Sequence, residues 1–182
     1  MSEQAKTKVR LATVWLDGCS GCHMSFLDMD QRLLDIAGLI DLVYSPLVDN
    51  KEFPESVDVT LVEGSVSTDE DIVKIHKIRK HTKILISLGD CAVTGNVPAM
   101  RNPFGLDAIF DRAYNENAAI QKQKPTSYLP TLLERERPVH EVVKVDLFLP
   151  GCPPPADAIF YVVAELLAGR TPNTATVSRF GR

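Results

Sequence analysis

The segment that decides the fold lies near the amino terminus and reads VRLATVWLDGCSGCHMSFL, residues 9–27. It begins with a mostly apolar run, residues 9–16, whose length is typical of a buried strand. Two glycines and two cysteines follow within residues 18–22, and apolar positions then recur with helical spacing over residues 25–37. A strand, a glycine-containing turn and a helix in this order predict the start of a βαβ unit.

Further strands and helices alternate along the rest of the chain. Strand-like runs occupy residues 40–44, 57–62, 83–88 and 145–149, and helical patterns occupy residues 69–80 and 156–168, with Gly169 as a natural stop. This alternation predicts a parallel sheet covered by helices on both faces. The expected fold class is α/β, a flavodoxin-like doubly wound parallel sheet in a single domain, residues 1–182.

One long segment, residues 94–141, does not follow the alternation. It is rich in proline, asparagine and charged residues, has only short helical patterns such as residues 106–114, and far exceeds an ordinary connection. We interpret it as an insertion before the last strand. It is either a solvated excursion or a partner-binding surface, because loops often carry function.

Composition narrows the class of protein. Apolar residues make up 45% and charged residues 24%, as in soluble globular proteins, and a net charge of -4 offers nucleic acid no attraction. The longest apolar stretch, residues 158–168, is about half a membrane span and contains Glu165, so we expect no membrane span. With no signal-peptide core or twin-arginine pair near Met1, we expect a cytoplasmic protein.

The four cysteines, Cys19, Cys22, Cys91 and Cys152, each follow a predicted strand. In open α/β sheets the carboxyl ends of the strands form the ligand-binding edge, so we expect the four thiols to lie together. In a reducing cytoplasm such a set indicates metal binding or catalysis rather than disulfides. Nearby glycines would let backbone N–H groups approach cluster sulfurs. The sequence therefore predicts one iron–sulfur cluster.

Other uses of these residues stay open. Zinc is the main competitor, although structural zinc sites usually pair two C-x2-C knuckles and this chain has only one. A redox pair at Cys19 and Cys22 would leave the other two cysteines unexplained. His23 could tune the cluster by hydrogen bonding or replace a ligand, whereas we expect the other three histidines to be solvated.

Four motifs together resemble the small subunits of nickel–iron hydrogenases, over about residues 9–168. The motifs are Cys19-x-x-Cys22, Val62-Glu-Gly-Ser65, Gly89-Asp-Cys-Ala92 and Pro150-Gly-Cys-Pro-Pro154. The resemblance implies one proximal [4Fe-4S] cluster held by the four cysteines. It also implies a large subunit, which carries the nickel–iron centre where hydrogen is split, and an electron-relay role for this chain.

The likeness is greatest to the cytoplasmic, NAD-reducing bidirectional type of hydrogenase. The chain shows neither a twin-arginine leader nor a cysteine-bearing extension after Cys152, and residues 18–27 and 138–146 are similar to that type. This implies a diaphorase module, with its own iron–sulfur clusters and flavin, that passes electrons to NAD.

Two alternative functions remain. The homologous cluster-bearing subunit of complex I, which serves quinone reduction, shares the Pro-Gly-Cys-Pro-Pro run but resembles a tandem Cys-Cys pair at the first site. An FMN-binding flavodoxin-like module would need a hydroxyl-rich loop after the first strand, where this chain has thiols.

Glu63 follows the predicted strand at residues 57–62 and so lies at the same edge as the cysteines. A carboxylate in a partly desolvated site can relay protons, so we expect Glu63 to serve proton movement or the geometry between the cluster and the nickel–iron site. The alternative is a surface residue before a helix that Ser67 or Thr68 could cap alone.

Overall fold

The computed structural model describes residues 7–178 and residue 180. Its centre is a five-stranded sheet in the order β2-β1-β3-β5-β7, and every neighbouring pair is parallel. The strands are β1 (Val9–Trp15), β2 (Ile40–Tyr44), β3 (Val57–Glu63), β5 (Thr82–Leu88) and β7 (Leu147–Leu149). This is the flavodoxin-like order, which reverses between β1 and β3. The predicted α/β class is confirmed.

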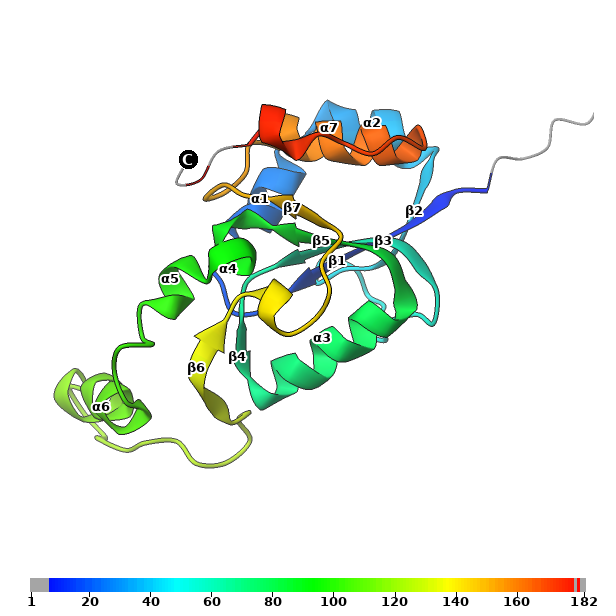
Figure 1. Ribbon diagram of the computed structural model, residues 1–182. Helices are drawn as coiled ribbons and strands as arrows, with labels where there is room; N and C mark the ends of the chain where they lie inside the picture. Colours follow the sequence, from blue (N-terminus) through cyan, green and yellow to red (C-terminus); the bar gives the residue numbers. More distant parts are fainter. Residues whose placement is uncertain (1–6, 179, 181–182) are drawn as a thin grey trace, which may run out of the picture.

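Helices cover both faces of the sheet (Figure 1). On one face, α1 (Gly21–Leu27), α2 (Gln31–Ala37) and α7 (Ala156–Leu167) bury an apolar cluster that includes Phe26 and Ile159. On the other face, α3 (Asp69–His81) packs Ile75 and Ile78 against β-strand residues such as Val62. Because β3 and β5 are buried on both faces, their sequences are rich in valine, leucine and isoleucine.

The helix predicted over residues 25–37 is wrong as a single element. The chain forms two short helices, α1 and α2, and Asp30 between them has a φ of 54°. A positive φ interrupts helical geometry, but the apolar spacing continues across the break. The last strand is also shorter than predicted, since β7 spans only Leu147–Leu149.

The expected insertion, residues 94–141, contains its own secondary structure. It holds α5 (Asn96–Ala99), α6 (Leu106–Asp111), a π-helical turn (Arg112–Glu116), β6 (Leu132–Arg137) and a 3₁₀ turn (Val139–Glu141). Strand β6 pairs antiparallel with β4 (Val66–Thr68), the segment that directly follows β3. The far part, with α6, projects away from the central sheet (Figure 1). A second short 3₁₀ turn, Thr174–Thr176, follows α7.

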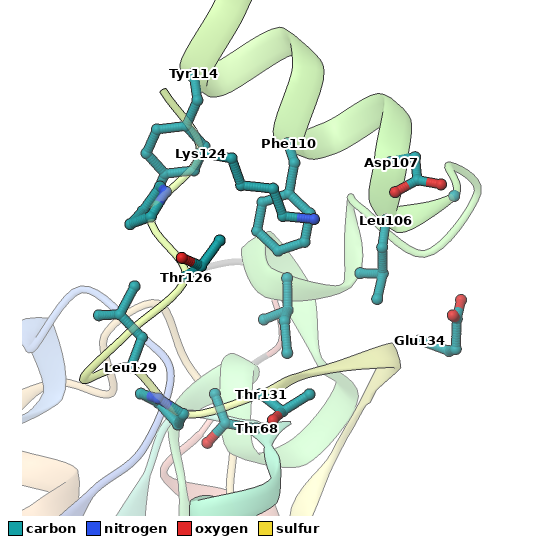
Figure 2. Close-up of a pocket in the computed structure, with 14 residues that line it drawn as sticks. Thr68, Leu106, Asp107, Phe110, Tyr114, Lys124, Thr126, Leu129, Thr131 and Glu134 are labelled. Carbon is teal, nitrogen blue, oxygen red and sulfur yellow. The ribbon is translucent and has the colours of Figure 1, made fainter. Parts of the chain in front are cut away.

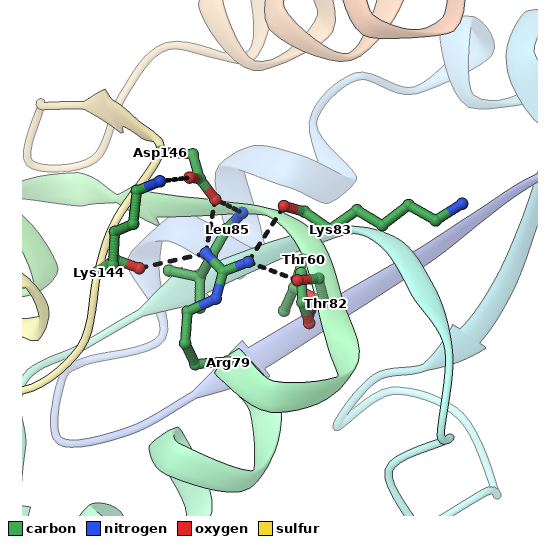
Figure 3. A network of polar contacts seen from close by, with 7 residues as sticks. All are labelled: Thr60, Arg79, Thr82, Lys83, Leu85, Lys144 and Asp146. Carbon is green, nitrogen blue, oxygen red and sulfur yellow. Dashed lines mark hydrogen bonds and ion pairs between the residues drawn. The ribbon is translucent and has the colours of Figure 1, made fainter.

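A network around Arg79 holds the carboxyl end of α3 against the sheet (Figure 3). Its guanidinium donates to the carbonyls of Thr82, Lys83 and Lys144 and to the Asp146 carboxylate. Asp146 also accepts the Leu85 backbone N–H at 2.9 Å. Burial raises the pKa of Asp146, but these donors outweigh it and hold the pKa below its usual value. The network therefore favours an ionised Asp146 between β5 and β7.

Among the residues that the structure describes, no helix is long and apolar enough to cross a membrane.

Candidate metal centre

All four cysteines line one hollow at the carboxyl edge of the sheet. Cys19 and Cys22 follow β1, Cys91 lies in α4 (Gly89–Thr94) after β5, and Cys152 follows β7. The hollow measures about 90 Å³ and also touches Glu63. It therefore lies beside the switch point between β1 and β3, where this fold binds ligands.

Asp90 ties together two of the segments that carry the cysteines. Its backbone N–H donates to the Gly151 carbonyl at 2.9 Å, and its carboxylate accepts the Gly151 N–H at 2.7 Å. This double link joins the residue before Cys91 to the residue before Cys152. The Ser25 hydroxyl donates to the Pro154 carbonyl and connects α1 to the same loop. Thiols from three distant segments are thus held in fixed positions.

Two glycines leave room for the sulfur atoms. A Cβ added at Gly89 would lie 2.2 Å from Cys22 Sγ, and a Cβ at Gly21 would lie 3.3 Å from Cys19 Sγ. Gly89 has a φ of 82°, which side chains rarely adopt. The backbone is therefore shaped around the thiols.

The thiols of Cys22 and Cys91 are disfavoured as free anions. Burial raises the pKa of both, and the Glu63 carboxylate and the other thiols raise that of Cys22 further. A bound cationic centre reverses this effect, because a coordinating thiol is deprotonated. Four such thiols around a small hollow fit an iron–sulfur cluster.

The size of the hollow also limits which cofactors could bind in it. Pockets for drug-sized molecules and cofactors are typically ~300–1,000 Å³, several times larger than this hollow of about 90 Å³. A flavin does not fit there. Within residues 7–178 and 180, no group of three or more His, Cys, Asp or Glu side chains meets the spacing of a single-ion site. The four thiols around the hollow remain the candidate ligands of a cluster.

Glu63 is buried and paired with His23. Its side chain accepts the His23 backbone N–H at 2.7 Å, and the same oxygen lies 2.6 Å from His23 Nδ1. Glu63 is 2% exposed and His23 is 3% exposed. Glu63 is therefore not a surface residue, although Thr68 does cap α3 through a capping box with Asp71.

The second nitrogen of His23, Nε2, is buried and has no hydrogen-bond partner among the described residues. The ring lies edge-on to Trp15, with 6.0 Å between the ring centroids. From the sequence alone, His23 is expected only to tune the cluster by hydrogen bonding or to replace a ligand. The one sequence signal for its contact with Glu63 is that His23 directly follows Cys22, at the edge where Glu63 is also expected.

A larger cavity lies elsewhere, within the insertion. It measures about 800 Å³, and its lining includes Phe110, Tyr114 and Lys124 but none of the four cysteines (Figure 2). The two aromatic rings stack, and the Lys124 ammonium lies 3.9 Å from the centre of the Phe110 ring. The sequence does not indicate this cavity, because it forms where residues 105–134 of the insertion fold back on themselves, beside Thr68.

Known proteins resemble this chain in both sequence and fold. The family model described as NADH ubiquinone oxidoreductase, 20 Kd subunit, matches residues 19–166. The delta subunit of the NAD-reducing hydrogenase HoxS of Cupriavidus necator is 45% identical over 168 residues, which are 90% of this chain and 80% of that subunit. One subunit of the F420-non-reducing hydrogenase vhu of Methanocaldococcus jannaschii is 36% identical, and the match covers 92% of this chain but 59% of the relative.

Solved structures agree with these matches. A chain from the crystal structure of an NAD+-reducing [NiFe]-hydrogenase in the H2-reduced state superposes with a TM-score of 0.91 at 38% identity, covering 96% of this chain and 99% of that chain. A [NiFeSe]-hydrogenase chain from Dm. baculatum, at 18% identity and a TM-score of 0.58, shares the fold.

Fold and site together define a doubly wound α/β protein with a four-cysteine centre at its switch point. The chain belongs to the NADH ubiquinone oxidoreductase 20 Kd subunit family, and the predicted resemblance to small subunits of nickel–iron hydrogenases is confirmed.

Proposed function

We propose that this chain is the small subunit of a cytoplasmic NAD-reducing nickel–iron hydrogenase. It relays electrons between a nickel–iron centre on a large subunit and a diaphorase module that reduces NAD. The single observation that carries the proposal is the superposition on a chain of an NAD+-reducing [NiFe]-hydrogenase, with a TM-score of 0.91 over 96% of this chain. The 45% identity to the HoxS delta subunit supports the same assignment.

The cofactor of the proposal is one [4Fe-4S] cluster ligated by Cys19, Cys22, Cys91 and Cys152. When bound, it accepts and donates single electrons, at a potential set by hydrogen bonds, charge and burial. The chain supplies the four thiolates, and the Asp90 link to Gly151 fixes two of the segments that carry them. Glycines at positions 21 and 89 keep side chains away from the sulfurs.

Glu63 is proposed to move protons between this edge and the large subunit, or to maintain the geometry between the two centres. Its burial and its 2.6 Å contact with His23 Nδ1 support a role inside the site. Glu63→Gln keeps the shape but cannot ionise, so hydrogen-driven NAD reduction should fall by roughly a hundredfold. The matched control is Glu134→Gln on the exposed side of β6. Full activity of a cluster-loaded Glu63→Gln complex at all pH values would disprove the relay.

A complex I type of function is the weaker candidate. The family model carries the name of a complex I subunit, but the relatives and the structures described above are hydrogenase subunits. Quinone-coupled activity without hydrogen oxidation in the native complex would reverse this ranking.

The proposal is tested on the complex purified anaerobically from its native source. Iron and acid-labile sulfide should each approach ~4 per copy of this chain for a cubane, after correction for clusters on other subunits. Mass spectrometry should find a nickel-bearing large subunit and a flavin-containing diaphorase. Stoichiometric zinc in place of iron, or a monomer without such partners, would refute the assignment.

A further inference from the structure

The side chain of Asn96 lies against two of the four thiols. Its amide nitrogen Nδ2 is 3.4 Å from Cys152 Sγ and 4.0 Å from Cys91 Sγ. An amide NH2 carries two donors, and a thiolate sulfur accepts hydrogen bonds. Because Cys91 follows β5 and Cys152 follows β7, one side chain reaches thiols from two separate segments of the chain.

The backbone at Asn96 is unusual for a residue with a side chain. Its φ is 39°, and Gly95 before it has a φ of 88°. Asparagine tolerates this region better than most residues, but glycine would adopt it at lower cost. The Gly95 N–H donates to the Cys91 carbonyl at 3.0 Å, which fixes the turn relative to that ligand. The turn therefore places an amide over the sulfurs at some cost in backbone energy.

We propose that Asn96 raises the reduction potential of the cluster by donating N–H···S hydrogen bonds to Cys152 and Cys91. The inference rests on the proposed function, since it requires the four cysteines to hold a cluster. The reduced cluster carries one more negative charge than the oxidised cluster, so donors to its sulfurs stabilise the reduced form more. An ionised Glu63, on the wall of the same hollow, would instead lower the reduction potential.

The test is an EPR-monitored redox titration of the assembled complex with three variants. Asn96→Gly removes the amide and leaves a residue suited to positive φ, whereas Asn96→Asp replaces the donors by a charged acceptor. Asn102→Ala is the matched control, because the Asn102 amide bonds Glu136, at 3.0 Å from the Glu136 carbonyl. We expect Asn96→Gly to lower the ratio of reduced to oxidised cluster about tenfold at a fixed potential, which is about 59 mV for one electron.

Asn96→Asp should lower the potential further, and Asn102→Ala should leave it unchanged. An unchanged potential in a cluster-loaded Asn96→Gly complex, or an equal shift in Asn102→Ala, would overturn the inference. A parent complex with no iron at this site would instead refute the proposed function.

A second measurement needs no variant. Asparagine labelled with 15N only at its side-chain amide is incorporated into the parent complex, and pulsed EPR of the reduced cluster is recorded. A hyperfine coupling from the labelled nitrogen is expected, because Asn96 Nδ2 lies 3.4 Å from a ligand sulfur. Absence of that coupling would overturn the inference even if the variants fail to assemble.

Discussion

Gly89→Ala is expected to empty the cysteine centre, for a reason of geometry. The new Cβ would lie 2.2 Å from Cys22 Sγ, whereas ordinary contact begins at 3.4 Å. The sulfur would have to move by more than a metal site tolerates, which is about 0.5 Å. The alanine would also hold a φ of 82°, which costs about 1–2 kcal/mol. The iron, the acid-labile sulfide and the visible absorption that belong to this chain's centre should be lost, after correction for clusters on other subunits.

Alanine substitutions at two other glycines distinguish the effect of the steric clash from the energetic cost of a positive φ. Gly169→Ala has a similar φ, 73°, with nothing within 4 Å of the new Cβ, so it should lose about 1–2 kcal/mol of stability and keep its iron. Gly38→Ala has open space and a φ of -70°, so it should lower neither the stability nor the iron content. A Gly89→Ala complex with full iron content would refute the packing of Cys22 against Gly89.

Three further variants test stability by denaturant unfolding. Asp146→Asn should lower the free energy of unfolding by about 1–3 kcal/mol at pH 7, because the carboxylate binds Arg79 and the Leu85 N–H. Its folded pKa is depressed, so the difference from the parent should shrink as pH falls below about 4, and a constant difference would contradict this. Glu136→Gln should stabilise the chain at pH 7, because burial raises the pKa of Glu136 and disfavours its ion, and the two proteins should converge at about pH 4. Thr68→Ala removes the cap of α3 and should cost about 1 kcal/mol, and an unchanged midpoint would count against the capping box.

The sequence predicts most of the central sheet because its strands are buried on both faces. Residues 57–63 and 82–88 are rich in valine, leucine and isoleucine, and such sequences arise when helices cover both sides of a sheet. The placement of Cys91 and Cys152 follows from the same pattern, since each lies just beyond a strand. Strand order then sets which cysteines become neighbours.

Features that depend on tertiary contacts could not be predicted in this way. Strand β6 reads LLERER, a charged sequence that forms a strand because it pairs with β4, and Glu136 within it is buried. The contacts of His23 with Glu63 and of Asn96 with Cys152 depend on how segments that are distant in the sequence face one another. Spacing along the chain carries no information about such contacts.

The separation of the ligands along the chain constrains the order of events during biosynthesis. Cys152 emerges from the ribosome only after β7, the last strand of the central sheet, has been made. A nascent chain that lacks β7 has three of the four thiols and no Gly151 to receive the Asp90 link. The full set of four thiols is therefore present only after every strand of the central sheet has been synthesised.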